Sequence, residues 1–430
     1  MARAELKRGL PRWLVQSGLT TALLFELGCG AKSLSNEEQA EAAGAPTSSE
    51  VGDAETPPLG EVASAGAESS EGGTDPGALP PPNPDVVKTC QSSGADWCAE
   101  LASGKEDVAS AVAVDSQGNV VITGYTTGNL AGNANQEGAR EPFVAKYTPN
   151  GELVWLRQFG PDETGYAEGI ATDADDNIAI VGVKYGAPDI QYGFLAKLTS
   201  QGQRLWTRQS GQLPGSVAVD PSGNIAWVAL TITGRDVSPT LKKYSPAGAL
   251  LWQRELSAED GYVTCDSAGD ILLSGSEAVS AAGGTGWLEK FSATGERLWG
   301  AQSSVGFSLT SVSSSGDFFV LGNDVHWLLR RYTGLGELVW SEPADSSLFD
   351  ETGIAINPRG ELVIAGMSSD FKRGYDTYVV KLSADGKRLG GKALGLEGDG
   401  VFCTLALGPD GEVFVAGPLR SSAFLVRVSL

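Results

Sequence analysis

The sequence has few residues of the kinds that most often bind metals or carry out catalysis. It contains one histidine, His326, and five cysteines, none of which forms a Cys-x-x-Cys pair. Zinc sites of the common types need such pairs or several histidines, so we expect no metal and no cofactor. The sequence also lacks a Gly-x-Ser-x-Gly elbow and a phosphate-binding glycine loop, which argues against an enzyme.

Positive charge and helix-forming sequence are scarce as well. The formal net charge of -22 gives a negative field that repels phosphate backbones, and no basic patch offsets it. We therefore expect no nucleic-acid partner. The 57 glycines and the aromatic content of 8% favour many turns and short strands over helices.

The N-terminus has the pattern of an export signal at residues 1–28. Four basic residues precede an apolar run that extends from Trp13 to Phe25, and Leu27-Gly28-Cys29 follows it. Leu27-Gly28-Cys29 resembles the bacterial lipobox, which implies lipidation of Cys29. Glu26 departs from that pattern because a carboxylate opposes insertion. A plain signal peptide or an uncleaved signal anchor therefore stays open.

Residues 29–95 are predicted to be a disordered acidic tether. They consist mainly of Ala, Gly, Ser, Glu and Pro, with almost no large apolar side chains to offset the entropy of ordering. Between residues 30 and 90, eleven acidic residues oppose two lysines, a net charge of -9. Repulsion between these charges would extend the tether.

The cysteines near the end of this segment suggest one disulfide. Cys90 and Cys98 are close enough in sequence to close a small loop in an oxidising compartment. Cys265 and Cys403 lie in strand patterns about three repeats apart. We expect these two to be buried thiols.

Residues 96–430 are built from seven repeats, each of which carries two recognisable segments. The first segment is a strand-like run that ends in Asp-x-x-Gly-Asn or a relative of it. Its copies are Asp115 to Asn119, Asp173 to Asn177, Asp220 to Asn224, Asp266 to Asp270, Ser314 to Asp317, Asn357 to Glu361 and Gly408 to Glu412.

The second segment places a basic residue before a glycine turn and a tryptophan strand. Its basic residues are Lys146, Lys197, Lys243, Lys290, Arg331, Lys381 and Arg427. The tryptophans are Trp155, Trp206, Trp252, Trp299 and Trp340, and Gly390 takes the tryptophan position in the sixth repeat. The seventh repeat stops after its basic residue.

Each repeat is predicted to form a four-stranded antiparallel meander. In the first repeat the strands are Ala109 to Asp115, Asn119 to Thr126, Pro142 to Tyr147 and Glu152 to Phe159. A single meander exposes two apolar faces, so seven of them must stack around an axis as a seven-bladed, all-β propeller. Residues Asp96 to Leu101 resemble a fourth strand, and we expect them to close the ring by pairing into the last blade.

These repeats resemble the SBBP family of bacterial β-propeller repeats. The resemblance covers residues 96–430 and is closest at Asp115 to Asn119 and at Phe143 to Tyr147. It implies a surface or exported protein without implying a single activity.

Three regular features have both a structural and a functional interpretation. The Asp-x-x-Gly-Asn turns favour turn chemistry over calcium, because only Asp173 to Asn177 concentrates oxygen ligands. The tryptophans favour packing between blades over sugar stacking. We expect each basic residue to pair with a nearby carboxylate or carbonyl group instead of forming an anion-binding ring.

We expect the function to be binding or scaffolding by the variable loops on one face of the propeller. The partner would be an unidentified protein or glycan, and the chain would be a monomer held at the cell envelope by its lipid alone, or secreted. The candidate binding residues are Tyr125, Arg140, Tyr166, Tyr185, Tyr192, Phe371, Arg373 and Tyr375.

Two alternatives remain open. One is a carbohydrate-active enzyme that uses paired acids, with Asp162, Glu163, Asp350 and Glu351 as candidates. The other is an envelope assembly scaffold like the lipoprotein propellers with Gly-x-x-x-Trp repeats, although those typically have eight blades.

Overall fold

The computed structural model describes most of the propeller region and little that precedes it. The described residues are 70–71, 84–132, 138–160, 163–186, 191–233, 236–256, 261–276, 286–303, 306–323, 327–344, 348–368, 376–396 and 403–430. The predicted signal peptide and Cys29 lie outside these residues. No helix within the described residues is both long and apolar enough to cross a membrane.

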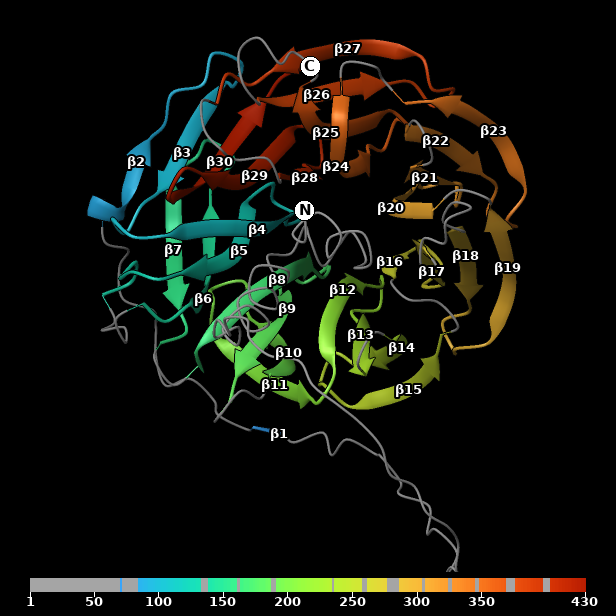
Figure 1. Ribbon diagram of the computed structural model, residues 1–430, viewed down its shortest axis with the longest axis horizontal. Coiled ribbons are helices and arrows are strands. Elements are labelled where there is room, and N and C mark those ends of the chain that lie inside the picture. The colour runs from blue at the N-terminus through green and yellow to red at the C-terminus, as the bar shows by residue number, and fades with distance from the viewer. Residues whose placement is uncertain are drawn as a thin grey trace, which may run out of the picture.

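The described strands form seven antiparallel sheets arranged as blades around a central axis (Figure 1). Blade one contains β4 (Asp107–Val114), β5 (Val120–Thr126), β6 (Glu141–Tyr147) and β7 (Leu153–Gln158). Blade two contains β8 (Gly165–Thr172), β9 (Ile178–Tyr185), β10 (Gln191–Leu198) and β11 (Arg204–Ser210). Blade three contains β12 (Leu213–Val219), β13 (Ile225–Thr233), β14 (Asp236–Tyr244) and β15 (Leu250–Glu255). The first strand of each blade lies nearest the axis.

The remaining blades repeat this order. Blade four contains β16 (Tyr262–Cys265), β17 (Ile271–Ser276), β18 (Gly286–Phe291) and β19 (Arg297–Ser303). Blade five contains β20 (Gly306–Val312), β21 (Phe318–Asn323), β22 (Trp327–Tyr332) and β23 (Leu338–Pro343). Blade six contains β24 (Leu348–Ile356), β25 (Leu362–Ser368), β26 (Thr377–Leu382) and β27 (Arg388–Ala393). Blade seven contains β28 (Thr404–Leu407), β29 (Val413–Leu419), β30 (Ser422–Val428) and β3 (Trp97–Leu101). The predicted seven-bladed propeller is confirmed.

The ring closes as expected, through an N-terminal strand. β3 pairs with β30 antiparallel, from Trp97 opposite Arg427 to Leu101 opposite Ala423. The indole Nε1 of Trp97 then donates to the carbonyl oxygen of Pro149 in blade one, at 3.1 Å. β3 therefore supplies both the missing strand and the missing tryptophan of the last blade.

Ordered structure begins before the predicted boundary at residue 96. The 3-10 helix η1 (Pro84–Val86) and β2 (Val87–Thr89) lie within the predicted tether, and β2 pairs with β3. Val86 is buried, which offsets the entropy of ordering this segment. A further short strand, β1 (Ser70–Glu71), pairs with the outer edge of blade two at β11.

A disulfide joins Cys90 to Cys98, whose Cα atoms are 5.2 Å apart. It closes the hairpin of β2 and β3, so the segment before the ring is linked covalently to the strand that closes it. The other two cysteines among the described residues have free thiols: Cys403 is buried as expected, whereas Cys265 is only partly buried.

Asp-x-x-Gly-Asn residues form tight turns between the first and second strands of the blades. In blade one, the Asp115 carboxylate accepts hydrogen bonds from the backbone N–H groups of Gln117 and Asn119, at 2.9 and 2.8 Å. Gly118 has a φ of 78°, which a glycine adopts without steric cost. The turn chemistry explains why this motif repeats.

The basic residues form ion pairs within their own blades, as expected. Lys243 Nζ lies 2.8 Å from Asp220 Oδ2 in a fully buried pair, and also donates to Ala293 O of the next blade at 3.2 Å. Burial alone would raise the pKa of Asp220, but hydrogen bonds from Lys243 and Asn224 lower it. The corresponding pairs are Lys146 with Asp115, Lys197 with Asp173, Lys290 with Asp266, Arg331 with Asp317, Lys381 with Glu361, and Arg427 with Asp96.

The tryptophans join neighbouring blades. The indole Nε1 of Trp206 donates to Pro246 O of blade three at 3.0 Å, and that of Trp252 donates to Ala293 O of blade four at 3.2 Å. A Cβ added to Gly295 would lie 2.8 Å from the Trp252 ring, so only glycine fits beneath it. Packing is thus confirmed, with Trp155 and Trp206 buried and Trp252 and Trp299 partly buried.

Gly390 stands at the tryptophan position of blade six, opposite Lys381, and a Cβ added there would meet no atom within 4 Å. In blade seven no glycine turn joins the third and fourth strands, because β30 and β3 come from distant parts of the sequence. A tryptophan at position 390 would therefore have no glycine turn of blade seven on which to pack.

Candidate functional site

Four of the predicted binding residues converge at the junction of blades one and two. Tyr125 lies near the end of β5, Arg140 just before β6, Tyr166 at the start of β8 and Tyr185 at the end of β9. All four positions are at the same end of the blades, opposite the Asp-x-x-Gly-Asn turns. We call these four residues the tyrosine cluster.

The tyrosine cluster is held by ring contacts across the blade junction. The Tyr166 ring centroid lies 6.4 Å from that of Tyr125 and 6.0 Å from that of Tyr185. The Arg140 guanidinium carbon lies 4.4 Å from the Tyr125 ring centroid, and the Tyr125 hydroxyl donates to Glu106 Oε1 at 2.9 Å. These contacts give a preformed aromatic surface with one positive charge.

Tyr166 occupies the centre of the cluster and is only 3% exposed. Its hydroxyl group is buried and has no hydrogen-bond partner. Burial, followed by the nearby carboxyl group of Glu168, raises the pKa of Tyr166. Buried hydroxyl groups without a hydrogen-bond partner are uncommon in folded proteins.

Buried carboxyl groups fix the loops beside the cluster. Asp107 accepts hydrogen bonds from Thr126 Oγ1 at 2.5 Å and from Ser103 N at 2.7 Å, and burial raises its pKa. Glu141 accepts from Gln158 Nε2 at 2.6 Å, and burial raises its pKa also. These contacts position the ends of β4, β5 and β6 from which the cluster projects.

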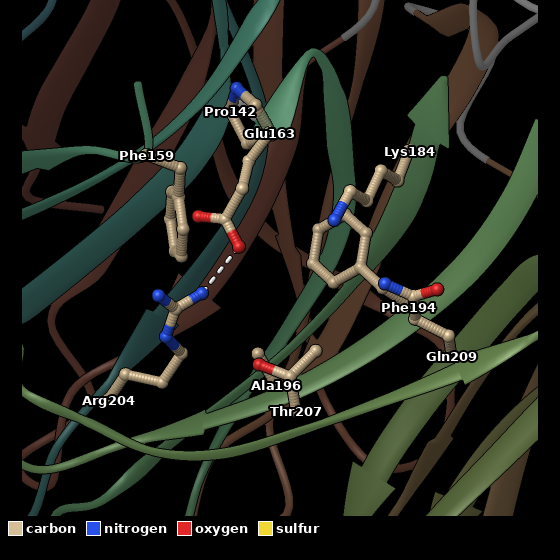
Figure 2. Close-up of a pocket in the computed structure, with 9 residues that line it drawn as sticks. All are labelled: Pro142, Phe159, Glu163, Lys184, Phe194, Ala196, Arg204, Thr207 and Gln209. Carbon is tan, nitrogen blue, oxygen red and sulfur yellow. Dashed lines mark hydrogen bonds and ion pairs between the residues drawn. The ribbon is translucent and has the colours of Figure 1, made fainter. Parts of the chain in front are cut away.

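A small cavity lies between the same two blades, farther from the axis (Figure 2). Its volume is about 20 Å³, room for about one water molecule. Figure 2 shows Arg204 and Glu163 paired across it, with Phe159 on the blade-one side and Phe194 on the blade-two side. The cavity is too small for an organic ligand.

A larger hollow of about 330 Å³ lies at the end of the propeller axis opposite the tyrosine cluster. It is lined by the turns of blades two to five, including Asp173, Asp220 and Asp266 beside Cys265. Each of these carboxylates already forms an ion pair with a lysine. Their charges are therefore balanced by lysines within the blades.

The remaining candidates fall into two groups. Tyr192 lies on β10 opposite Lys184, one strand farther from the axis than Tyr185. Phe371, Arg373, Tyr375, His326 and Asp162 lie outside the described residues, as do the side chains of Asp350 and Glu351. Among the residues that the structure describes, no three metal-binding side chains are close enough to hold an ion.

Glu168 is a residue of this region that the sequence reasoning missed. It lies on β8, nearest the axis, and one of its carboxyl oxygens, Oε1, is buried without a hydrogen-bond partner. Aligning the repeats on their turns would have revealed it, because the equivalent positions hold small residues.

The fold defines the chain as a seven-bladed β-propeller. The family model SBBP, described as a beta-propeller repeat, matches residues 97–131, which span β3 to β5. The predicted resemblance to SBBP repeats is confirmed by this match.

Two solved structures are similar in fold. A protein of unknown function from Bacteroides caccae is 16% identical, with a TM-score of 0.42, and the alignment covers 58% of this chain and 89% of that one. BamB from Moraxella catarrhalis is 11% identical, with a TM-score of 0.43, and the alignment covers 81% of this chain and 96% of that one. No curated protein matches the sequence. The function is therefore inferred from the residues of this chain.

Proposed function

We propose that the protein is an exported binding module, lipid-anchored through Cys29 at the bacterial cell envelope, and that the tyrosine cluster is the centre of its recognition surface. The N-terminal pattern of residues 1–29 supports export and anchoring, and the acidic segment after it would hold the propeller away from the membrane.

The observation that carries the binding role is the convergence of Tyr125, Arg140, Tyr166 and Tyr185 from four separate segments. Tyrosine and arginine are enriched where proteins recognise partners, because they combine a large apolar surface with polar groups. The unpartnered Tyr166 hydroxyl adds a polar group that a ligand would satisfy. The alternative with paired catalytic acids has less support, since Glu163 is already paired with Arg204.

Site-specific photo-crosslinking tests this proposal. A photoreactive amino acid at position 185, in the full chain on intact cells, should form adducts with the partner. The control position is 335, which is 78% exposed on the turn between β22 and β23 at the other end of the blades. Adducts at 335 as abundant as those at 185, or none at 185, would show that the cluster is not a recognition surface.

A further inference from the structure

One position in the propeller differs between blade two and the other blades. It lies five residues before the first residue of each turn between the first and second strands. The seven residues are Ser110, Glu168, Gly215, Gly261, Ser308, Thr352 and Cys403. All of them are small except Glu168, so blade two alone places a long carboxylic side chain at this point.

A β-bulge coincides with this position. In β8, Ala167 pairs with Gly182 and Gly169 with Val181, which leaves Glu168 without a cross-strand partner. The first strands of blades one and five have the same irregularity at Ser110 and Ser308. Bulges redirect a side chain out of the regular ladder, and they are common beside functional sites.

Some polar groups at this level of the other blades are bonded within the protein. Thr352 Oγ1 lies 3.1 Å from Cys403 Sγ, and Ser216, next to Gly215, accepts from Val263 N at 2.7 Å. Glu168 Oε1 has no such bond, although it is buried. Two residues earlier on the same strand, the Tyr166 hydroxyl is also buried without a partner.

We propose that Glu168 and Tyr166 bind hydroxyl groups of a neutral saccharide that enters from the axial side and packs against the tyrosine cluster. The proposal rests on the proposed binding function of that cluster and names its ligand class. Glu168 remains partly exposed and lies on β8, the strand of blade two nearest the axis, so a ligand would meet Glu168 first and then the buried Tyr166 hydroxyl two residues before it.

A hydroxylated, uncharged ligand matches the chemistry of these two residues. Burial raises the pKa of Glu168 to about 8, so at neutral pH its carboxyl group is mostly protonated and both donates and accepts hydrogen bonds. The phenol of Tyr166 also does both. Sugar hydroxyls also both donate and accept hydrogen bonds. An anion would only accept them, and a cation would only donate them.

Calorimetric titration of the full chain with defined saccharides tests the inference. The probes are the hexasaccharides of the cello, malto, xylo, manno and chito series at neutral pH. At least one should bind. Tyr166→Phe keeps the ring and removes the hydroxyl, and Glu168→Ala removes the carboxyl, so each should weaken binding by about tenfold, as losing a buried hydrogen bond does.

Two variants serve as controls. Glu168→Gln keeps a donor and an acceptor and should bind within about threefold of the unchanged protein, well under one lost hydrogen bond. Tyr332→Phe removes a phenol from a buried residue in blade five that stacks on Phe318, and should leave binding unchanged.

Binding to none of the five saccharides would overturn the inference, and so would binding that Tyr166→Phe and Glu168→Ala leave intact. The crosslinks at position 185 separate this result from a failure of the proposed function. Adducts there without saccharide binding would leave a binding surface with a different ligand. If neither adducts at position 185 nor saccharide binding is found, the proposed binding function and the saccharide proposal both fail.

Discussion

At the scale of single residues, the tryptophans connect the blades. Trp206 is buried against the turn of blade three, where a Cβ on Gly248 would lie 2.8 Å from its ring. Its side chain thus combines a large apolar contact with the hydrogen bond to Pro246 O. Neither feature depends on a ligand.

We expect Trp206→Ala to lower the free energy of unfolding by about 3 to 5 kcal/mol, the range for truncating a large buried aromatic residue. Leu335→Ala, at a residue that is 78% exposed, should change it by less than about 0.5 kcal/mol. Denaturant unfolding measures both. A loss below about 1 kcal/mol for Trp206→Ala would indicate a surface residue instead.

Glu168 gives a pH dependence of defined sign. Because burial raises its pKa to about 8 from the ordinary value of 4.5, the unfolded chain loses this proton at lower pH than the folded chain does. The stability it contributes is full below about pH 4.5 and decreases as the pH rises to about 8. The titratable group that interacts with Glu168 is Tyr166, which in turn interacts with Tyr125, Tyr185 and Arg140.

Glu168→Gln removes this titration. The variant should therefore melt at the same temperature as the unchanged protein near pH 4.5, and at a higher temperature from pH 8 upward. Thermal melts across this range provide the measurement. A difference in melting temperature that stays constant with pH would show that Glu168 titrates normally.

At the scale of elements, the ring depends on β3. Removing the chain through Leu101 takes away the outer strand of blade seven, the contact of Trp97 with blade one and the disulfide. It also exposes the edge of β30 as an unpaired strand, which favours aggregation.

This truncated chain should unfold at a lower temperature or aggregate, whereas deletion of residues 30–69 should leave the melting temperature nearly unchanged. The second deletion stops before β1, since Ser70 and Glu71 pair with blade two. Thermal melts with light scattering compare the two proteins. Equal damage from both deletions would contradict the role assigned to β3.

Features that recur in every repeat could be predicted from the sequence, whereas most features that occur once could not, the disulfide between Cys90 and Cys98 being an exception. The turn at Asp115 and the strand with Trp155 are each seen several times, so the blade number and the closing strand followed directly. The ion pair of Lys243 with Asp220 was also expected, because both residues recur at fixed positions.

The tyrosine cluster was predicted only as a set of loop residues. Tyr125 and Tyr166 are 41 positions apart, and their contact depends on how two blades meet in space. Glu168 is visible only as an exception to a pattern of small residues, once the repeats are aligned on their turns. The η1 and β2 segment was missed because Val86 and Cys90 stand in otherwise low-complexity sequence.

At the scale of the whole molecule, the proposed anchor decides where the protein resides. If Cys29 is lipidated, Cys29→Ser should move the protein from the membrane fraction to the soluble fraction, because the apolar acyl chains are what hold it. Fractionation of cells followed by immunoblotting measures this. Unchanged membrane retention would leave an uncleaved signal anchor as the better account.

The disulfide protects the closure of the ring against force applied to the tether. A pull on the tether would first detach β1 from β11 and would then separate β2 from β3, starting where Val87 lies opposite Leu101. The covalent link between Cys90 and Cys98 would then stop this separation and transfer the load to Cys98, the second residue of β3. From there the force is shared along the ladder between β3 and β30. Tension on the tether would therefore strain a covalent loop before it could open the ring.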